Sequence, residues 1–255
     1  LDMSMFESLL SKNTKLVAIS HVSNTLGTIN PIKNIIKKSH QAGAKVLIDG
    51  AQASSHIALN MQDLNADFYC FSAHKMYGPT GVGVLYGKEQ LLNELPVYQG
   101  GGEMIKEVRI DKTTFADLPY KFEAGTPNIA GIIAFKNAVD FILEIGLDAI
   151  ASYENTLLEY ATVELKKIEG VKLFGVSNYK SAIISFNIEG VHPYDVGVLL
   201  DKMGIAIRTG HHCTQPIMER FNIPGTVRIS LAVYNTIEEI DICIRAIKKA
   251  KLMLS

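Results

Sequence analysis

Nine residues near the carboxyl end, RTGHHCTQP (208–216), bring together an arginine, two adjacent histidines and one of the three cysteines of the chain. Cys213 could be a buried apolar filler, a metal ligand or a nucleophile. Its polar, glycine-containing loop disfavours the filler, and three adjacent residues rarely point at one ion in tetrahedral geometry, so no metal site is predicted. A nucleophile fits best, because Arg208 and the neighbouring imidazoles favour the thiolate, which is the reactive form.

A second group of polar residues follows three apolar segments, each with the composition of a buried strand. Ligands of open α/β sheets bind beyond the carboxyl ends of the strands, so three consecutive strand ends of this kind predict one site. His21 is given no role in it. The residues of this group are His21, Asn24, Asp49, Gln52, Ser72, His74 and Lys75.

The chemistry of this group points to pyridoxal 5'-phosphate. An aspartate after a buried strand can pair with a protonated ring nitrogen, and a sheltered lysine is the natural Schiff-base former because its pKa falls on desolvation. The cofactor needs both groups. Taken alone, Asp49 is typical of a turn and Lys75 of a solvated surface, so the prediction depends on their combination.

The elements that must position these residues alternate in residues 1–145. Strands are predicted over 15–21, 45–50, 66–74 and 81–87, and a helix that starts near Pro31 and stops at Gly43 lies between the first two. Such alternation predicts a mostly parallel sheet covered on both faces, in an α/β domain.

The pattern of predicted helices and strands changes in residues 146–255, which are predicted to form a smaller α+β domain that carries the loop of Cys213. The last helix has a capping box, Thr236 with Glu239, and an apolar stripe. The predicted helices cover 147–167, 194–203 and 237–253, and the predicted strands cover 181–188, 205–209 and 226–231.

Composition narrows the class of protein. The 255 residues are 47% hydrophobic and carry a formal net charge of -1, which is typical of a soluble globular protein and gives no reason to expect nucleic acid or a membrane surface as partner. No apolar run approaches the roughly 20 residues that span a bilayer. Cys70, Cys213 and Cys243 lie far apart without a CxxC pair, so neither a disulfide framework nor structural zinc is predicted, and a cytoplasmic location is expected.

The quoted segments resemble a known family. The motifs DGAQASSH (49–56), FSAHKMYGPTGVGVLYG (71–87), FEAGTPN (122–128), RTGHHCTQP (208–216) and VRISLAVYNT (227–236) resemble, in this order, those of class V aminotransferase-fold enzymes, most closely the group II (Suf-type) cysteine desulfurases. The resemblance implies the fold type I of pyridoxal-phosphate-dependent transferases. Family members are longer at the amino terminus, where a Gly-Thr phosphate loop, a ring-stacking histidine and the first strands lie, so we expect a fragment with an incomplete large domain.

The resemblance also implies roles. Lys75 would bind the cofactor covalently and Cys213 would be the nucleophile, while Arg208, by our own reasoning, supports the active site. Thr126 would reach the phosphate of a neighbouring subunit, which implies a homodimer. The other implied contacts are Asp49 to the pyridine nitrogen, Gln52 to the phenolic oxygen, Ser72 and His74 to the phosphate, and Asn24 and Arg228 to the substrate carboxylate.

The implied reaction converts L-cysteine to L-alanine and leaves the sulfur on Cys213 as a persulfide. A Suf-type acceptor protein would collect it for iron–sulfur cluster assembly, and selenocysteine is a further possible substrate. Two alternatives stay open: another class V enzyme, such as an aminotransferase or a different lyase, and a truncated chain that acts as a scaffold or is inactive. Among the remaining residues, we expect His40 and His56 at the surface and Cys70 and Cys243 as core fillers.

Overall fold

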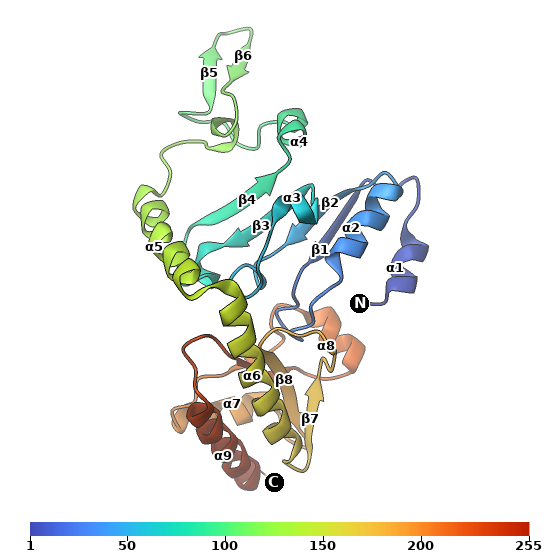
Figure 1. The fold of residues 1–255 in the computed structure, drawn as a ribbon, viewed down its shortest axis with the longest axis vertical. Coiled ribbons are helices and arrows are strands. Elements are labelled where there is room, and N and C mark those ends of the chain that lie inside the picture. The colour runs from blue at the N-terminus through green and yellow to red at the C-terminus, as the bar shows by residue number, and fades with distance from the viewer. Residues whose placement is uncertain (255) are drawn as a thin grey trace. The chain divides into compact units, whose positions relative to one another are not determined.

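The computed structural model describes residues 1–254, which form two compact units (Figure 1). The first unit comprises Leu1–Ser20, Pro31–Ser55 and Leu59–Glu144. The second comprises His21–Asn30, His56–Ala58 and Ile145–Ser255. Two short segments that follow strands of the first unit therefore belong to the second, and one of them carries Asn24.

The first unit is built on a four-stranded sheet of order β1-β2-β3-β4. β1, β2 and β3 run parallel and β4 runs antiparallel to β3, so the predicted mostly parallel sheet is confirmed. All four predicted strands are present. They are β1 (Leu16–Ser20), β2 (Lys45–Asp49), β3 (Phe68–Ser72) and β4 (Gly83–Gly87).

The helix between β1 and β2 forms where the sequence predicts it. Pro31 precedes its first turn, and Ile32, Ile35 and Ile36 form its buried face. Ile32 and Ile36 pack in one cluster with Val46 and Ile48 of β2 and with Tyr69 of β3, because the helix and the sheet are apolar on the sides that meet. The helices are α1 (Met3–Leu9), α2 (Ile32–Gln41), α3 (Met61–Leu64), α4 (Glu89–Glu94) and α5 (Ile129–Ile145), with short 3₁₀ turns η1 (Ala73–Lys75) and η2 (Tyr120–Phe122).

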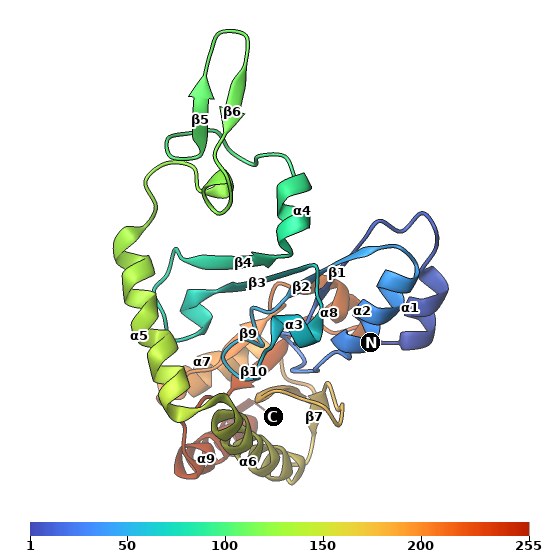
Figure 2. The same cartoon turned by 45° about the horizontal axis from the view of Figure 1, so that its top comes forward.

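A hairpin of β5 (Ile105–Val108) and β6 (Thr113–Phe115) was not predicted. In both views it stands apart from the four-stranded sheet of its own unit (Figures 1 and 2). Its strands are short and mostly exposed, so they lack the apolar alternation by which a strand is recognised.

The second unit has an antiparallel sheet of order β7-β8-β10-β9. The predicted strand 205–209 is wrong in extent, because β9 begins only at Arg208, and Ile205 and Ile207 pack against the core before it. β7 and α8 were not predicted. The elements are α6 (Leu147–Lys166), β7 (Val171–Phe174), β8 (Ile183–Ile188), α7 (Pro193–Lys202), β9 (Arg208–Gly210), α8 (Gln215–Phe221), β10 (Thr226–Ser230) and α9 (Ile237–Leu254).

The core of the second unit lies between this sheet and the helices α6, α7 and α9. The predicted capping box of α9 is confirmed: the Thr236 amide donates to Glu239 Oε2 at 3.1 Å, and the Glu239 amide donates to Thr236 Oγ1 at 3.2 Å. Within residues 1–254, no helix is both long enough and apolar enough to span a membrane.

Two histidines predicted at the surface are half-buried and bonded to acidic side chains. His40 Nε2 lies 2.7 Å from Asp67 Oδ2, and His56 Nδ1 lies 2.7 Å from Glu154 Oε2. The surface prediction for both was wrong, because each acidic partner is almost fully buried and draws the imidazole inward.

Candidate active site

The ends of β2 and β3 bring four predicted site residues to one edge of the first sheet. Asp49 closes β2 and pairs in register with Cys70 of β3, two residues before Ser72 closes that strand. The turn η1 follows at once and contains His74 and Lys75. We call Asp49, Gln52, Ser72, His74 and Lys75 the strand-end cluster.

The backbone after Asp49 can turn only because residue 50 is glycine. A Cβ there would lie 2.0 Å from the ring of Tyr69, which is fully buried beneath it. Asp49 Oδ1 accepts the Ala51 amide at 2.9 Å, and this closes an Asx turn that fixes the carboxylate. Burial, followed by the negative charge of Asp49, raises the pKa of both Tyr69 and Cys70, so these two neighbours stay neutral.

The backbone of η1 is held through Ala73, which is fully buried. Its amide donates to the Val82 carbonyl at 3.0 Å, and its carbonyl accepts from Met76 at 2.8 Å and from Gly78 at 3.0 Å. His74 and Lys75 are therefore presented from a fixed backbone, and both are exposed. Among the described residues, no carboxylate forms a salt bridge with Lys75, so its amine is available to a ligand.

Thr126 lies in a separate part of the first unit. It follows Gly125, whose φ is +78°, and precedes α5 in an exposed loop. Within residues 1–254, no hydrogen bond links Thr126 to the strand-end cluster.

In the second unit, the loop from His211 to Thr214 follows β9 and carries Cys213 (the cysteine loop). Cys213 is exposed and unpaired as a disulfide, and Arg208 Nη2 donates to its sulfur at 3.7 Å. His212 is only 2% exposed, and its Nε2 lies 2.9 Å from Thr226 Oγ1 and 3.1 Å from the Thr226 carbonyl. The loop thus presents a thiol to solvent next to a guanidinium, above a buried imidazole.

Two arginines form a candidate anion site beside the cysteine loop. Arg208 of β9 and Arg228 of β10 are register partners on adjacent antiparallel strands, where like charges repel unless an anion lies between them. Arg228 Nη1 donates to the Asn24 carbonyl at 2.7 Å, while its buried Nε has no partner in the described structure. Burial, followed by the charge of Arg208, lowers the pKa of Arg228, so a neighbouring anion would stabilise the charged guanidinium.

Asn24 connects this anion site to the cysteine loop. Its side-chain Nδ2 donates to the His212 carbonyl at 2.7 Å, so the amide predicted to bind substrate directly already has a protein acceptor. Thr25 Oγ1 and Thr214 Oγ1 share a further hydrogen bond of 2.8 Å. Sequence reasoning missed Thr25, Thr214 and Thr226; Thr25 and Thr214 lie 189 positions apart, and the Thr226 partner, His212, is 14 positions away.

The charge state of His212 corrects one expectation. Burial, followed by the charge of Arg228, lowers the pKa of His212 to about 4. Its ring is therefore neutral near pH 7 and gives Cys213 no positive charge. Arg208 is the cation that touches the sulfur.

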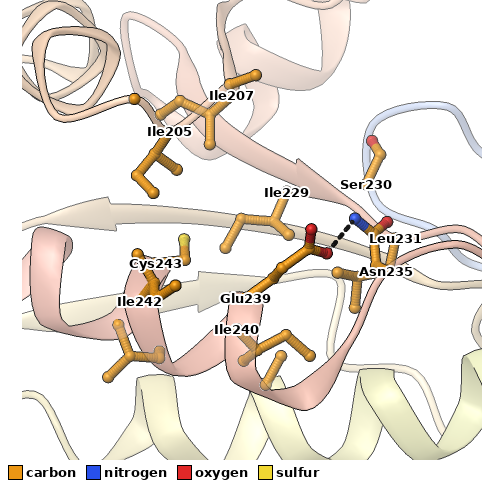
Figure 3. Close-up of a pocket in the computed structure, with 14 residues that line it drawn as sticks. Ile205, Ile207, Ile229, Ser230, Leu231, Asn235, Glu239, Ile240, Ile242 and Cys243 are labelled. Atoms are coloured by element: carbon orange, nitrogen blue, oxygen red, sulfur yellow. Dashed lines mark hydrogen bonds between the residues drawn. The ribbon is translucent and has the colours of Figure 1, made fainter.

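An apolar cavity of about 410 Å³ also lies in the second unit, between β10, α9 and the segment before β9 (Figure 3). Its polar groups are already used, since Asn235 Nδ2 donates to Glu239 Oε2 at 3.0 Å within the cap of α9. Burial raises the pKa of Cys243, in its wall, to about 11, which keeps that thiol protonated. This cavity lacks reactive groups, and the candidate active-site residues are those of the strand-end cluster, the arginine pair and the cysteine loop.

Known proteins resemble this chain over most of its length. A family model described as Aminotransferase class-V matches residues 1–243. A cysteine desulfurase of Enterobacter sp. (strain 638) is 48% identical over 255 residues, which are 100% of this chain and 63% of that protein. The chain thus spans less than two thirds of the length of this curated relative.

Solved structures show the same fold. The cysteine desulfurase CsdA from Escherichia coli matches with a TM-score of 0.95 at 36% identity, over 100% of this chain and 63% of that one. A cysteine desulfurase from Thermococcus onnurineus NA1 matches with a TM-score of 0.95 at 38% identity, over 100% and 64%. These matches confirm the predicted fold type I, and the chain belongs to the class V aminotransferase family.

Proposed function

We propose that this polypeptide is a cysteine desulfurase, which converts L-cysteine to L-alanine and holds the sulfur on Cys213 as a persulfide. The observation that carries the proposal is the exposed Cys213 thiol in contact with Arg208, whose register partner on the adjacent strand is Arg228. A carboxylate site beside a thiol suits an amino acid whose reacting atom is sulfur. Similarity to proteins named cysteine desulfurase supports the same assignment.

The strand-end cluster fits pyridoxal 5'-phosphate. This cofactor requires an amine, a carboxylate, and hydroxyl and imidazole groups, and the strand-end cluster holds all of them. The Lys75 amine has no carboxylate partner among the described residues, and the Asp49 carboxylate is held by the Ala51 amide. Burial and then the charge of this carboxylate raise the pKa of Tyr69. Lys75 would hold the cofactor covalently. Asp49 would pair with its ring nitrogen, Gln52 with its phenolic oxygen, and Ser72 and His74 with its phosphate. When bound, the cofactor supplies an electron sink for the carbon skeleton.

The residues of the chain then divide the remaining work. Arg228 and Arg208 bind the substrate carboxylate, and Asn24 fixes Arg228 through its carbonyl. Lys75 Nζ carries the proton removed from the substrate Cα. The Cys213 sulfur attacks the substrate sulfur, so that an S–S bond forms as the C–S bond breaks. The electron pair stays with the carbon skeleton, which takes up protons and leaves as L-alanine.

The assembly and partners belong to the same proposal. Thr126 would serve the phosphate of a second copy, and the adjacent helix α5 supports a homodimer because Ile129, Ile132 and Ile133 are exposed on it. A Suf-type acceptor protein would collect the persulfide sulfur for iron–sulfur cluster assembly, and selenocysteine would be a second substrate. The free thiols of Cys70, Cys213 and Cys243 suit the reducing cytoplasm, where we place the enzyme.

Replacing Lys75 and Cys213 separately tests the proposal. With cofactor added, Cys213→Ser should keep the visible absorbance of Lys-bound cofactor and bind L-cysteine, yet form almost no alanine and no protein persulfide. Lys75→Ala should lose that absorbance and, after borohydride reduction, the added mass of bound cofactor. If Cys213→Ser made alanine at the parent rate, a different class V reaction would replace the desulfurase. A colourless parent protein would point to a scaffold.

A further inference from the structure

A closed ring of hydrogen bonds joins the anion site to the cysteine loop within the second unit. Arg228 Nη1 donates to the Asn24 carbonyl, and Asn24 Nδ2 donates to the His212 carbonyl, both at 2.7 Å. His212 Nε2 lies 3.1 Å from the Thr226 carbonyl, and Thr226 stands two residues before Arg228 on β10. His212 is the one member of this ring that belongs to the cysteine loop, directly before Cys213.

The hydrogen on the His212 ring follows from its partners. A carbonyl oxygen only accepts, so the contact with the Thr226 carbonyl requires that Nε2 carries the hydrogen. A protonated ring would add a third positive charge near Arg228 and Arg208, and His211 also lies in the same loop. The structure therefore selects a neutral ring that donates from Nε2.

The ring of hydrogen bonds holds a backbone conformation that residues other than glycine rarely adopt. His212 has a φ of +53° and Cys213 has a φ of +61°, and neither is glycine. Two consecutive non-glycine residues in the left-handed region persist only where the surroundings hold them. The Thr214 amide closes the turn around both residues by donating to the His211 carbonyl at 2.9 Å. The bonds at His212, on its imidazole and on its carbonyl, tie this turn to β10 and to Asn24.

We propose that His212 is a positioning residue, whose buried imidazole holds the cysteine loop in its left-handed conformation and in fixed relation to the carboxylate-binding Arg228. The catalytic value of holding Cys213 near Arg228 rests on the proposed desulfurase function. The conformational part, that His212 keeps Cys213 against Arg208, stands on the geometry alone. Without the Nε2 donor, the loop relaxes, and the sulfur loses its contact with the Arg208 guanidinium.

Two substitutions of similar size separate the donor from the bulk of the ring. His212→Gln keeps a neutral N–H donor within reach of Thr226, whereas His212→Leu fills the space without a donor. The first measurement is the rate at which iodoacetamide alkylates Cys213 at pH 7, followed by mass spectrometry of the loop peptide, which needs neither cofactor nor turnover. We expect His212→Leu to be slower than the parent by about fivefold, and His212→Gln to stay within about twofold, because a neighbouring cation supports the reactive thiolate.

The second measurement separates kcat from KM for L-cysteine in the cofactor-loaded enzyme. His212→Leu should lower kcat by about tenfold or more with KM within about threefold, because Arg228 keeps its bond to the Asn24 carbonyl while the nucleophile is displaced. His212→Gln should restore most of kcat. Thermal melting of each variant establishes that it is folded.

A second variant covers the case in which His212→Leu does not fold. Thr226→Val keeps the shape and the carbonyl of residue 226 but removes Oγ1, and it should slow alkylation by about twofold. The proposal is overturned if a folded His212→Leu, or Thr226→Val in its place, alkylates at the parent rate, or if His212→Gln is as impaired as His212→Leu. A parent that makes no alanine, combined with the predicted alkylation pattern, would remove the desulfurase function and leave the loop-holding role of His212 supported.

Discussion

The strand-end cluster and the cysteine loop hold their functional groups in opposite ways. In the strand-end cluster, the backbone is fixed by close approaches at Gly50 and by hydrogen bonds through Ala73, while Lys75 is left exposed. In the cysteine loop, side chains add to the backbone bond between Thr214 and His211: Asn24, 188 positions away, donates to the His212 carbonyl, and the His212 imidazole bonds to Thr226. The first region therefore leaves its donors and acceptors for a ligand to satisfy, and the second is ordered before any ligand arrives.

This difference predicts where substitutions act. A substitution in the strand-end cluster should lower catalytic activity and leave the protein folded, because few protein contacts depend on these side chains. A change in the hydrogen-bonded ring should alter both the geometry of Cys213 and the stability of the second unit. The predictions below run from the largest expected effect to the smallest.

Asp49→Asn should have the largest effect. The asparagine Oδ1 can still accept the Ala51 amide, so the turn survives, but a neutral side chain no longer holds a proton on the cofactor's ring nitrogen. We expect kcat to fall by about 100-fold or more at an unchanged melting temperature. Steady-state alanine formation and thermal melting measure the two quantities. Asp63→Asn, which removes an exposed partner of Lys33, is the matched control, and equal rates in the two variants would contradict the role of Asp49.

Arg228→Lys tests the other region at the substrate carboxylate. Lysine keeps the charge but loses the planar fork and the Nη1 bond to the Asn24 carbonyl. We expect kcat/KM for L-cysteine to fall by about 10- to 100-fold, in keeping with about 1.5–3 kcal/mol for a charge-assisted hydrogen bond, with most of the change in KM. Arg220→Lys, at an exposed position of α8, is the control. A loss confined to kcat would argue that Arg228 does not bind the carboxylate.

The same contrast explains what the sequence could predict. Asp49 ends the apolar strand β2 and Lys75 ends the short turn that follows β3, so their places at the sheet edge can be inferred from short local patterns. Helix α2 and the capping box of α9 are also local, and both were predicted correctly. Local patterns were sufficient for the strand-end cluster because its geometry is set by neighbours in sequence.

The cysteine loop could be recognised only as a set of reactive residues. Its geometry depends on Asn24 and Thr226, and nothing in a polar segment near residue 24 reports a bond to a carbonyl near residue 212. The buried pairing of His56 with Glu154 was missed for the same reason, since the two residues are 98 positions apart. The physical cause is that burial, which fixes both partners, is decided by the whole fold of the unit.

Acid should weaken the second unit through His212. Its pKa is lowered from 6.5 to about 4 in the folded chain, so between these values the unfolded chain binds a proton that the folded chain refuses. The contribution of His212 to the unfolding free energy therefore keeps its full value above pH 6.5 and decreases as the pH falls towards 4. His21, whose pKa burial also lowers to about 4, adds to the loss over the same range.

Urea unfolding at several pH values measures this effect. Between pH 7 and pH 4.5, the parent should lose about 1–2 kcal/mol more unfolding free energy than His212→Gln, which has no ring to protonate. Lys75→Ala, in the strand-end cluster, is the control and should follow the parent curve. Parallel curves for the parent and His212→Gln would show that the buried ring carries no acid sensitivity, and the two regions would then differ less than their hydrogen bonds indicate.

Thr236→Ala should give the smallest effect. It tests whether the ring of hydrogen bonds at the cysteine loop acts independently of the general stability of the second unit. The threonine hydroxyl accepts the Glu239 amide at the start of α9, and its loss should lower the unfolding free energy by about 1 kcal/mol, while Thr236→Ser should retain most of it. Because Thr236 is outside the ring of Arg228, Asn24, His212 and Thr226, the alkylation rate of Cys213 should stay at the parent value in both variants. If alkylation slowed in step with the lost stability, the cysteine loop would be held by the general stability of the second unit, and its hydrogen bonds would no longer set it apart from the strand-end cluster.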